Sequence, residues 1–291
     1  MSAPVLFDTP GPRARRNIMI ANVFGILIIA GILALVVSRF SQTGQLEASK
    51  WSSLFTAGAW TNYFLPGLQT TVVAAIYAVV LSVAFGIVFG LGRLAPFAWI
   101  RWVAGAVVEF FRAVPVLIMM FALWFGLSMA KIVDPTQTPL VAVVVALMLY
   151  NGSIIAELVR SGVYGLPKGQ REAASAIGMT HNQSLRIVEL PQALIAMLPS
   201  LLSQFVVILK DTALGYLVTY NELLTLGRQF GSGNSNLLQT LLLVAVVFIV
   251  INYTLTKLAD IVARRTSRRT SGKTAPHTPL PVARAADQAI D

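Results

Sequence analysis

The sequence predicts an all-α integral membrane protein with six transmembrane helices. Hydrophobic residues make up 56% of the 291 positions and charged residues only 12%, and the mean hydropathy is +0.73. Soluble domains carry about a quarter charged residues, so this composition does not fit a water-exposed surface. A helix needs about 20 mainly apolar residues to span the hydrocarbon core, and six such stretches exceed what a soluble core requires. The stretches without Asp, Glu, Lys or Arg are 17–38, 51–92, 113–130, 135–156, 190–209 and 229–256.

The chain begins with a polar, proline-containing segment, and we expect residues 1–17 to form a cytoplasmic arm. An extra N-terminal transmembrane helix is predicted over 18–38. The alternative for this stretch is a signal peptide, but its 22 uncharged residues exceed an h-region of about 7–15 residues, and no A-x-A-like cleavage site follows. We therefore interpret it as a retained helix.

A linker over residues 39–65 is expected on the extracytoplasmic side. It carries Trp51 and Trp60, and tryptophan is enriched at membrane interfaces. The second span is predicted to begin at Pro66, because a proline in the first helical turn loses no hydrogen bond there. It ends before Arg93.

The third span is predicted over residues 100–130, which is longer than a membrane crossing needs. It is interrupted by Glu109, Arg112 and Pro115. The remaining spans are predicted at 139–159, 191–216 and 236–259. Residues 263–291 are basic and then rich in Ala, Pro and polar residues, which predicts a disordered cytoplasmic tail.

The basic residues are distributed unequally between the loops of this six-span arrangement. One side holds Arg13, Arg15, Arg16, Arg93, Arg101, Arg160, Lys168, Arg171, Arg186, Arg264, Arg265, Arg268 and Arg269. The other side holds only Arg39, Lys50, Lys131 and Arg228. Because positive charge is retained on the cytoplasmic side, we expect both termini to be cytoplasmic.

The largest cytoplasmic loop, residues 160–190, is predicted to contain two short helices. The first covers about 170–177 and ends at Gly178, since glycine tolerates the left-handed conformation at a helix end. Thr180 followed by Gln183 has the pattern of a capping box for the second helix, and Pro191 is expected to open the fifth span. Helix physics alone leaves two interpretations, a loop helix lying on the membrane surface or a helix pair that meets a partner protein.

Several kinds of chemistry are excluded by the residues that the sequence lacks. The chain has no cysteine, and its two histidines, His181 and His277, lie far apart without metal-ligand spacing, so neither a metal site nor thiol chemistry is expected. It also lacks the G-x-x-x-x-G-K-[ST] pattern that cradles nucleotide phosphates, so we expect it to be no ATPase and to bind no cofactor itself. The net charge of +10 sits in the loops as a topology signal, and nucleic acid is not an expected partner.

The chain resembles the inner-membrane permease subunits of bacterial ABC importers of the polar amino acid type. The loop string Glu172-Ala173-Ala174, followed by Gly178 and closed by Leu190-Pro191, is similar to the EAA signature of that family. The other matching strings are Phe111-Arg112-Ala113-Val114-Pro115, Glu157-Leu158-Val159-Arg160 with Gly169-Gln170, and Leu209-Lys210-Asp211-Thr212-Ala213-Leu214. The family more often has Gly at the position of Ala113 and Ser at that of Ala213.

This resemblance implies a type I ABC importer permease core of five helices over residues 66–262, with 18–38 as an addition. It implies a multi-pass protein of the bacterial inner membrane that works with a cytoplasmic ABC ATPase dimer, a second permease chain and an extracytoplasmic solute-binding protein. ATP and Mg would be bound by the ATPase. The residues implied in coupling to it are Glu172, Ala173, Ala174, Gly178, Leu190 and Pro191.

Charged residues inside the predicted spans are expensive and normally face a cavity or a partner. Arg112 is either paired structurally with Glu109 or receives the carboxylate of the substrate at the break made by Pro115. The string of Lys210, Asp211 and Thr212 is the other candidate for the substrate pathway, with snorkelling of Lys210 to the interface as the alternative. Glu157 and Arg160, one helical turn apart, are expected to form a structural ion pair.

The linker sequence around Gln45 and Trp51 is similar to that of glutamate-type permeases, which favours glutamate or aspartate as the transported amino acid. A secondary transporter or channel for small polar solutes is the alternative, because it would have equally many spans. It would, however, be expected to show internal repeats, and none is visible. A membrane enzyme would need a converging catalytic set, which the sequence lacks.

Overall fold

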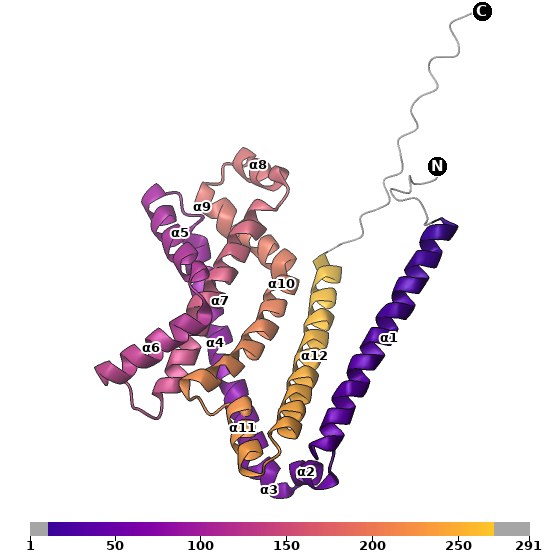
Figure 1. The fold of residues 1–291 in the computed structure, drawn as a ribbon. Helices are drawn as coiled ribbons and strands as arrows, with labels where there is room; N and C mark the ends of the chain where they lie inside the picture. Colours follow the sequence, from indigo (N-terminus) through magenta and orange to yellow (C-terminus); the bar gives the residue numbers. More distant parts are fainter. Residues whose placement is uncertain (1–10, 271–291) are drawn as a thin grey trace, which may run out of the picture.

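The computed structural model describes residues 11–270, and all regular structure in that range is helical. A helix that begins at Pro12 occupies part of the arm expected over 1–17, and a helix that ends at Thr270 occupies part of the tail over 263–291 that was expected to be disordered. The rest of both segments lies outside the described residues. The first helix, α1 (Pro12–Gln42), begins with a proline in its first turn and is longer than the expected 18–38. None of its residues is buried, and it stands apart from the other helices (Figure 1). Its apolar surface is therefore left for contact with lipid.

The predicted linker over 39–65 contains a series of short helical turns. They are α2 (Ala48–Ser52), the 3-10 turn η1 (Ser53–Phe55), α3 (Ala57–Ala59) and the π-turn η2 (Trp60–Phe64). Trp51 and Trp60 are half-buried and pack against a core cluster that includes Leu54, Phe64 and Phe230. Both tryptophans therefore anchor this segment to the rest of the fold, a role that the interface prediction did not include.

Two long helices, α4 (Leu65–Gly92) and α7 (Thr138–Tyr164), form the centre of the bundle. Their close approach depends on glycines. A Cβ atom at Gly86 would collide with the side chain of Ile155, and one at Gly90 would lie 2.8 Å from Cβ of Val159. The Gly86–Gly90 spacing, which occurs often by chance in membrane helices, is here the seam along which α4 packs on α7.

The predicted third span is divided into two helices, α5 (Ala98–Ala113) and α6 (Val116–Ala130), with an angle of 97° between them. Val114 and Pro115 connect them in extended backbone conformations. Proline cannot donate a hydrogen bond and pushes the preceding residue out of the helical region, so the break falls where the sequence places Pro115. The single span expected over 100–130 is thus a bent pair.

The second half of the chain contains one long, uninterrupted helical run. After α8 (Lys168–Ala176) the run comprises α9 (His181–Gln183), the π-helix η3 (Ser184–Glu189), α10 (Leu190–Asp211) and the 3-10 helix η4 (Thr212–Val218). Pro191 was expected to open the fifth span, but the helix already exists before it. The π-helical turn just before Pro191 accommodates a residue that has no N–H to donate.

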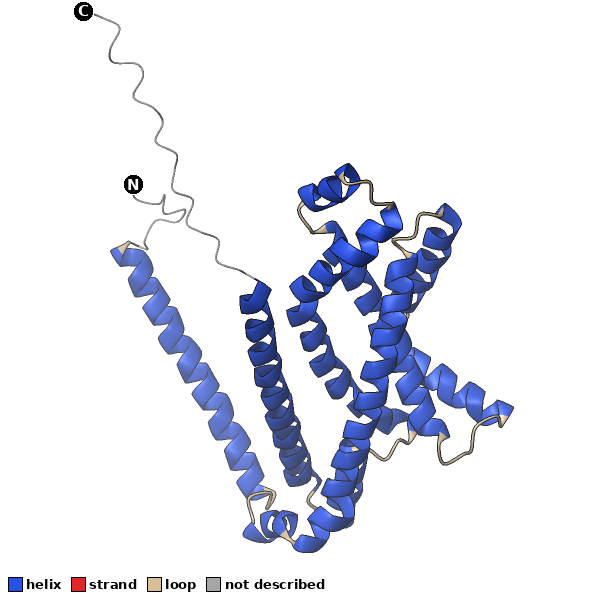
Figure 2. Ribbon diagram, turned by 180° about the vertical axis from the view of Figure 1, so that it is seen from behind, coloured by secondary structure: helices blue, strands red, loops and turns tan. Residues whose placement is uncertain are grey.

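The last helices are α11 (Leu223–Gly233) and α12 (Leu237–Thr270), and α12 extends past the predicted limits of the sixth span. Among the described residues, five helices are long and apolar enough to cross a membrane, or six if the bent pair counts as one span. Helices α8 and α9 belong to residues 160–190, the predicted site of coupling to the ATPase, which we call the coupling loop. They lie toward the same end of the molecule as the start of α1 and the end of α12 (Figures 1 and 2). Helices α2, α3 and α11 lie at the opposite end.

Candidate functional site

Helix α8 of the coupling loop ends in a complete Schellman motif. Gly178 has a φ of +81°, its N–H donates to the carbonyl of Ser175, and the N–H of Met179 donates to the carbonyl of Ala174, each at 3.0 Å. This pair of hydrogen bonds satisfies carbonyls that the helix end would leave free, and it requires a left-handed residue at the position of Gly178. The predicted helix end at Gly178 is confirmed.

The second short helix starts with the predicted capping box. The side-chain oxygen of Gln183 accepts the N–H of Thr180 at 2.8 Å, and the Thr180 hydroxyl accepts the N–H of Gln183 at 3.4 Å. Only one residue, Met179, separates Gly178 from this cap. The turn between the two helices is therefore fixed from both sides by local hydrogen bonds.

A buried ion pair, which the sequence interpretation missed, ties the two helices together. The Glu189 side chain is only 2% exposed, and its Oε2 lies 2.6 Å from Nη2 and 3.1 Å from Nε of Arg171. Ser184 donates its hydroxyl to the other carboxylate oxygen at 2.8 Å. The hydrogen bond to Glu189 raises the pKa of the Arg171 guanidinium, which favours the charged form of the arginine.

The residues implied in coupling do not all face outward. Glu172 and Ala173 are exposed, and the neighbouring Ile177 is 78% exposed, whereas Ala174 is buried within the chain. Leu190 packs against the core between α7 and α10, and Pro191 is exposed. The outward face of α8 thus combines a carboxylate with a small residue and an apolar one. Leu190 and Ala174 pack inside the protein and support this face from within.

A membrane charge cluster of five side chains joins α4, α5 and α7. Glu157 is its centre, with Arg93 at 2.6 Å, Arg160 at 2.9 Å and Arg112 at 3.7 Å. Glu109 lies 3.2 Å from Arg93 and 3.4 Å from Arg112. The predicted Glu157–Arg160 and Glu109–Arg112 pairs are both present, but each is part of this larger cluster.

A cavity of about 490 Å³ lies beside the cluster and is lined by Glu109, Arg112, Ala113, Tyr150 and Ile154. Tyr150 and Ile154 are in the middle of α7. Arg112 therefore borders an open space midway along the central helix, immediately before the α5–α6 break at Pro115.

The second predicted group of pathway residues lies at the other end of α10. Lys210 is exposed, and Asp211 is half-buried without a hydrogen-bond or ion-pair partner among the described residues. Thr212 is fully buried and donates its hydroxyl to the carbonyl of Leu209 at 2.6 Å. Thr212 thus serves the helix end rather than an open space.

A partly buried polar contact between α7 and α10 shows how far apart the two groups of predicted pathway residues lie along the bundle. One group is Arg112 with Pro115, and the other is Lys210 to Thr212. Gln204 donates to the side-chain oxygen of Asn151 at 2.5 Å, which sets these residues at one level of the bundle. Arg112 borders the cavity next to this level, beside Tyr150. Lys210 follows Gln204 by six residues, about 9 Å farther along the helix axis. The structure therefore places the groups on neighbouring levels and joins them by no direct ion pair.

The turn before α11 carries a buried acid that the sequence interpretation also missed. Glu222 is fully buried and accepts hydrogen bonds from the N–H groups of Leu224 and Thr225, at 2.6 and 2.7 Å, which caps α11. Burial raises the pKa of Glu222 to about 7. The neighbouring Tyr220 donates its hydroxyl to the carbonyl of Thr70 at 2.8 Å, and burial raises its pKa to about 12. This turn is thereby fastened to the start of α4.

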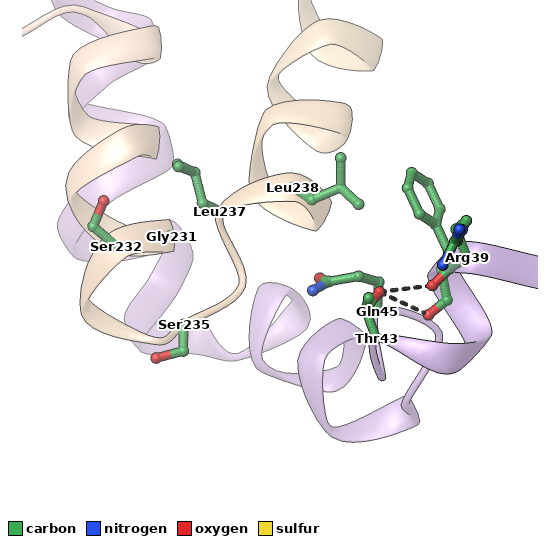
Figure 3. Close-up of a pocket in the computed structure, with 9 residues that line it drawn as sticks. Arg39, Thr43, Gln45, Gly231, Ser232, Ser235, Leu237 and Leu238 are labelled. Atoms are coloured by element: carbon green, nitrogen blue, oxygen red, sulfur yellow. Dashed lines mark hydrogen bonds between the residues drawn. The ribbon is translucent and has the colours of Figure 1, made fainter. Parts of the chain in front are cut away.

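The end of the molecule opposite the coupling loop has a cavity of about 630 Å³ between the end of α1 and the α11–α12 turn (Figure 3). It contains none of the predicted site residues. Within residues 11–270, no group of three or more His, Cys, Asp or Glu side chains is arranged to hold a metal ion.

Known proteins are similar to this chain in sequence and in fold. The family model for binding-protein-dependent transport system inner membrane components matches residues 82–268. The glutamate transport system permease protein GluD of Corynebacterium glutamicum is 45% identical over 225 residues, covering 77% of this chain and 82% of GluD. The glutamate/aspartate import permease protein GltK of Escherichia coli O6:H1 is 31% identical, covering 75% of this chain and 98% of GltK.

A solved structure described as an amino acid ABC transporter with histidines has a TM-score of 0.65 to this chain at 29% sequence identity. The similarity covers 71% of this chain and 95% of that chain.

Proposed function

We propose a function from the premise that the chain belongs to the family of binding-protein-dependent transport system inner membrane components, whose model matches most of its length. The chain is a membrane permease subunit of an ABC importer for amino acids. We propose that its cargo is glutamate or aspartate. The 45% identity to a glutamate permease supports this choice, as does the arginine-rich cluster beside the cavity that Arg112 lines. Membership of this family argues against the alternative of a secondary transporter or channel.

The structure of the coupling loop is the observation that best supports the proposed mechanism. A Schellman motif, a capping box and a buried ion pair fix two short helices at one end of the bundle, while Glu172 and Ile177 remain exposed. A loop that is rigid internally and exposed on its outer face can transmit a push. We infer that this face docks on a cytoplasmic ATPase dimer, which binds ATP and Mg on behalf of the complex.

The remaining partners follow from the same importer type. We infer a second permease chain, identical or paralogous, and an extracytoplasmic binding protein that delivers cargo at the end of the bundle opposite the coupling loop. Both termini would then lie in the cytoplasm of the bacterial cell, with the spans in its inner membrane. ATP drives transport only if it favours one membrane conformation over the other, and the coupling loop is where that difference is transmitted.

Uptake measurements test this function. The permease, reconstituted in vesicles with its ATPase and binding protein, should import labelled glutamate or aspartate when ATP is supplied, and should not do so with a non-hydrolysable analogue. A panel of labelled amino acids identifies the cargo. ATP-independent uptake of any of them would contradict the importer assignment.

A further inference from the structure

The membrane charge cluster does not balance its own charges. Among residues 11–270, Arg93, Arg112 and Arg160 face two carboxylates, Glu109 and Glu157, which leaves an excess of one positive charge. Arg112 lies within a predicted span, where an uncompensated charge is costly and normally faces a cavity or a partner. The cavity of about 490 Å³ beside Arg112 is where a compensating anion has room.

Of the three arginines, Arg112 lies farthest from Glu157. Arg93 and Arg160 lie within 3 Å of Glu157, at 2.6 and 2.9 Å, whereas Arg112 reaches both glutamates through Nη1 alone, at 3.4 and 3.7 Å. Its Nη2 and Nε have no hydrogen-bond or ion-pair partner within residues 11–270, and its side chain is 37% exposed. A guanidinium binds a carboxylate best through two parallel N–H groups, and the Nε–Nη2 edge offers such a pair.

Glu109 supplies the opposite charge on the same wall of the cavity. Its Oε1 contacts both Arg93 and Arg112, at 3.2 and 3.4 Å, while Oε2 has no ion-pair partner in the described part of the chain. The side chain is 59% exposed. The pair therefore presents two parallel donors next to a free carboxylate oxygen, which matches the carboxylate and the α-ammonium of an amino acid.

We propose that Arg112 and Glu109 form a cargo station that selects amino acids with a net negative charge; this rests on the proposed import of amino acids. The Nε–Nη2 edge of Arg112 takes a carboxylate of the cargo, and Oε2 of Glu109 takes its ammonium group. Glutamate, with a net charge of −1, cancels the excess charge of the cluster. Glutamine, with no net charge, leaves that excess in place, so the station discriminates between two amino acids of nearly equal size.

Equilibrium binding tests the station without interference from the binding protein. The permease–ATPase complex in lipid nanodiscs is titrated with radiolabelled L-glutamate and, separately, with L-glutamine. Arg112→Gln brings the cluster charge to zero and should lower the ratio of glutamate to glutamine affinity at least about tenfold, which corresponds to about 1.4 kcal/mol. Glu109→Gln brings the cluster charge to +2 and should raise that ratio, even though both ligands lose the ammonium contact.

Controls separate charge selection from a structural role. Arg101→Gln removes an arginine whose side chain, within the described part of the chain, donates to the carbonyls of Ala95 and Pro96 and to no other group, and it should leave the ratio unchanged. Arg112→Lys keeps the positive charge but loses the two parallel N–H donors of the guanidinium. It should weaken binding of both ligands and largely retain the ratio of glutamate to glutamine affinity. If Arg112→Gln and Glu109→Gln shift the ratio in the same direction, or not at all, the station is overturned.

The proposed function can fail independently. If the reconstituted importer takes up glutamate with ATP but the nanodisc complex shows no charge-dependent ratio, only the station is wrong. If the importer takes up no amino acid, the proposed function fails, and the station fails with it.

Discussion

Arg171 in α8 and Glu189 in η3, near the beginning of the long helical run, are joined by an ion pair of 2.6 Å, although they lie 18 residues apart in the sequence. The carboxylate is buried and the guanidinium lies half-exposed above it. This arrangement fixes the angle between the helices, since each end of the pair belongs to a different helix. It also makes Glu189 dependent on Arg171, because a buried carboxylate without a partner is strongly destabilising.

Arg171→Ala should therefore loosen the coupling loop while the membrane spans remain inserted. We expect a lower melting temperature of the purified complex and less ATPase subunit retained on affinity purification. The double variant Arg171→Met/Glu189→Met removes both charges and should recover most of the loss, since an apolar pair of similar volume can replace a buried ion pair. Lys168→Ala, at an exposed position of the same helix, is the control. A double variant no better than Arg171→Ala would contradict the ion-pair explanation.

The packing seam of α4 and α7 predicts a second stability effect. Gly86→Leu should destabilise the protein, because the first added carbon already collides with Ile155. Core overpacking typically costs about 1–3 kcal/mol. Gly126→Leu, where an added carbon meets nothing within 4 Å, should leave the melting temperature nearly unchanged. Equal losses in the two variants, measured by thermal unfolding in detergent, would show that the seam is not what limits packing.

Glu222 predicts a pH dependence of stability. Its pKa in the folded protein is about 7, above the ordinary value of 4.5, so between these values the folded state binds more protons than the unfolded state. The contribution of Glu222 is therefore fully present below pH 4.5 and is lost as the pH rises through 7. The melting temperature should be lower at pH 8 than at pH 5, and Glu222→Gln should reduce that difference. The exposed Glu47, changed to Gln, serves as the control, and an unchanged pH profile in Glu222→Gln would refute the assignment.

Sidedness can be measured with single thiols, because the chain contains no cysteine. Ile177→Cys lies on the coupling loop, and Ile132→Cys follows α6. The two positions are similarly exposed, at 78% and 74%. A membrane-impermeant maleimide added to intact spheroplasts should label the second thiol and reach the first only after lysis. Labelling of both from the same side would contradict cytoplasmic termini and six spans.

The sequence predicted those features that depend on neighbouring residues. The helix end at Gly178, the Thr180–Gln183 capping box and the break at Pro115 each require only a few adjacent positions, and each is present. The Arg171–Glu189 pair and the link from Arg93 to Glu157 could not be predicted, because the chain must fold back on itself before those side chains meet. The angle at Pro115 is likewise set by packing, since a proline fixes the position of a break but not its size.

The Gly86–Gly90 seam illustrates the same limit. The spacing of the two glycines is visible in the sequence, but such spacings are common in membrane helices. Only the folded structure shows that α7 packs against this pair of glycines. The burial of Glu222 could not be predicted for a related reason. A single acidic residue in a turn is expected to be solvent-exposed, and only the folded structure brings the start of α4 against it.

Gly178 offers the most direct test that the coupling loop transmits the action of the ATPase. An added Cβ atom there meets no neighbouring atom within 4 Å, so a substitution acts mainly through the left-handed backbone, which costs a β-branched residue about 1–2 kcal/mol. Asn tolerates this conformation, and Gly178→Asn should largely retain function. Gly169, in the same loop but with an ordinary backbone and open space around it, provides the matched control as Gly169→Ala.

The measurement is ATP-dependent uptake of labelled glutamate into vesicles that contain the permease, its ATPase and its binding protein. Gly178→Val should abolish uptake and weaken retention of the ATPase, while Gly169→Ala imports at close to the wild-type rate and the binding protein still docks on both. Wild-type uptake by Gly178→Val, with its ATPase fully retained, would contradict the assignment of this loop as the coupling element.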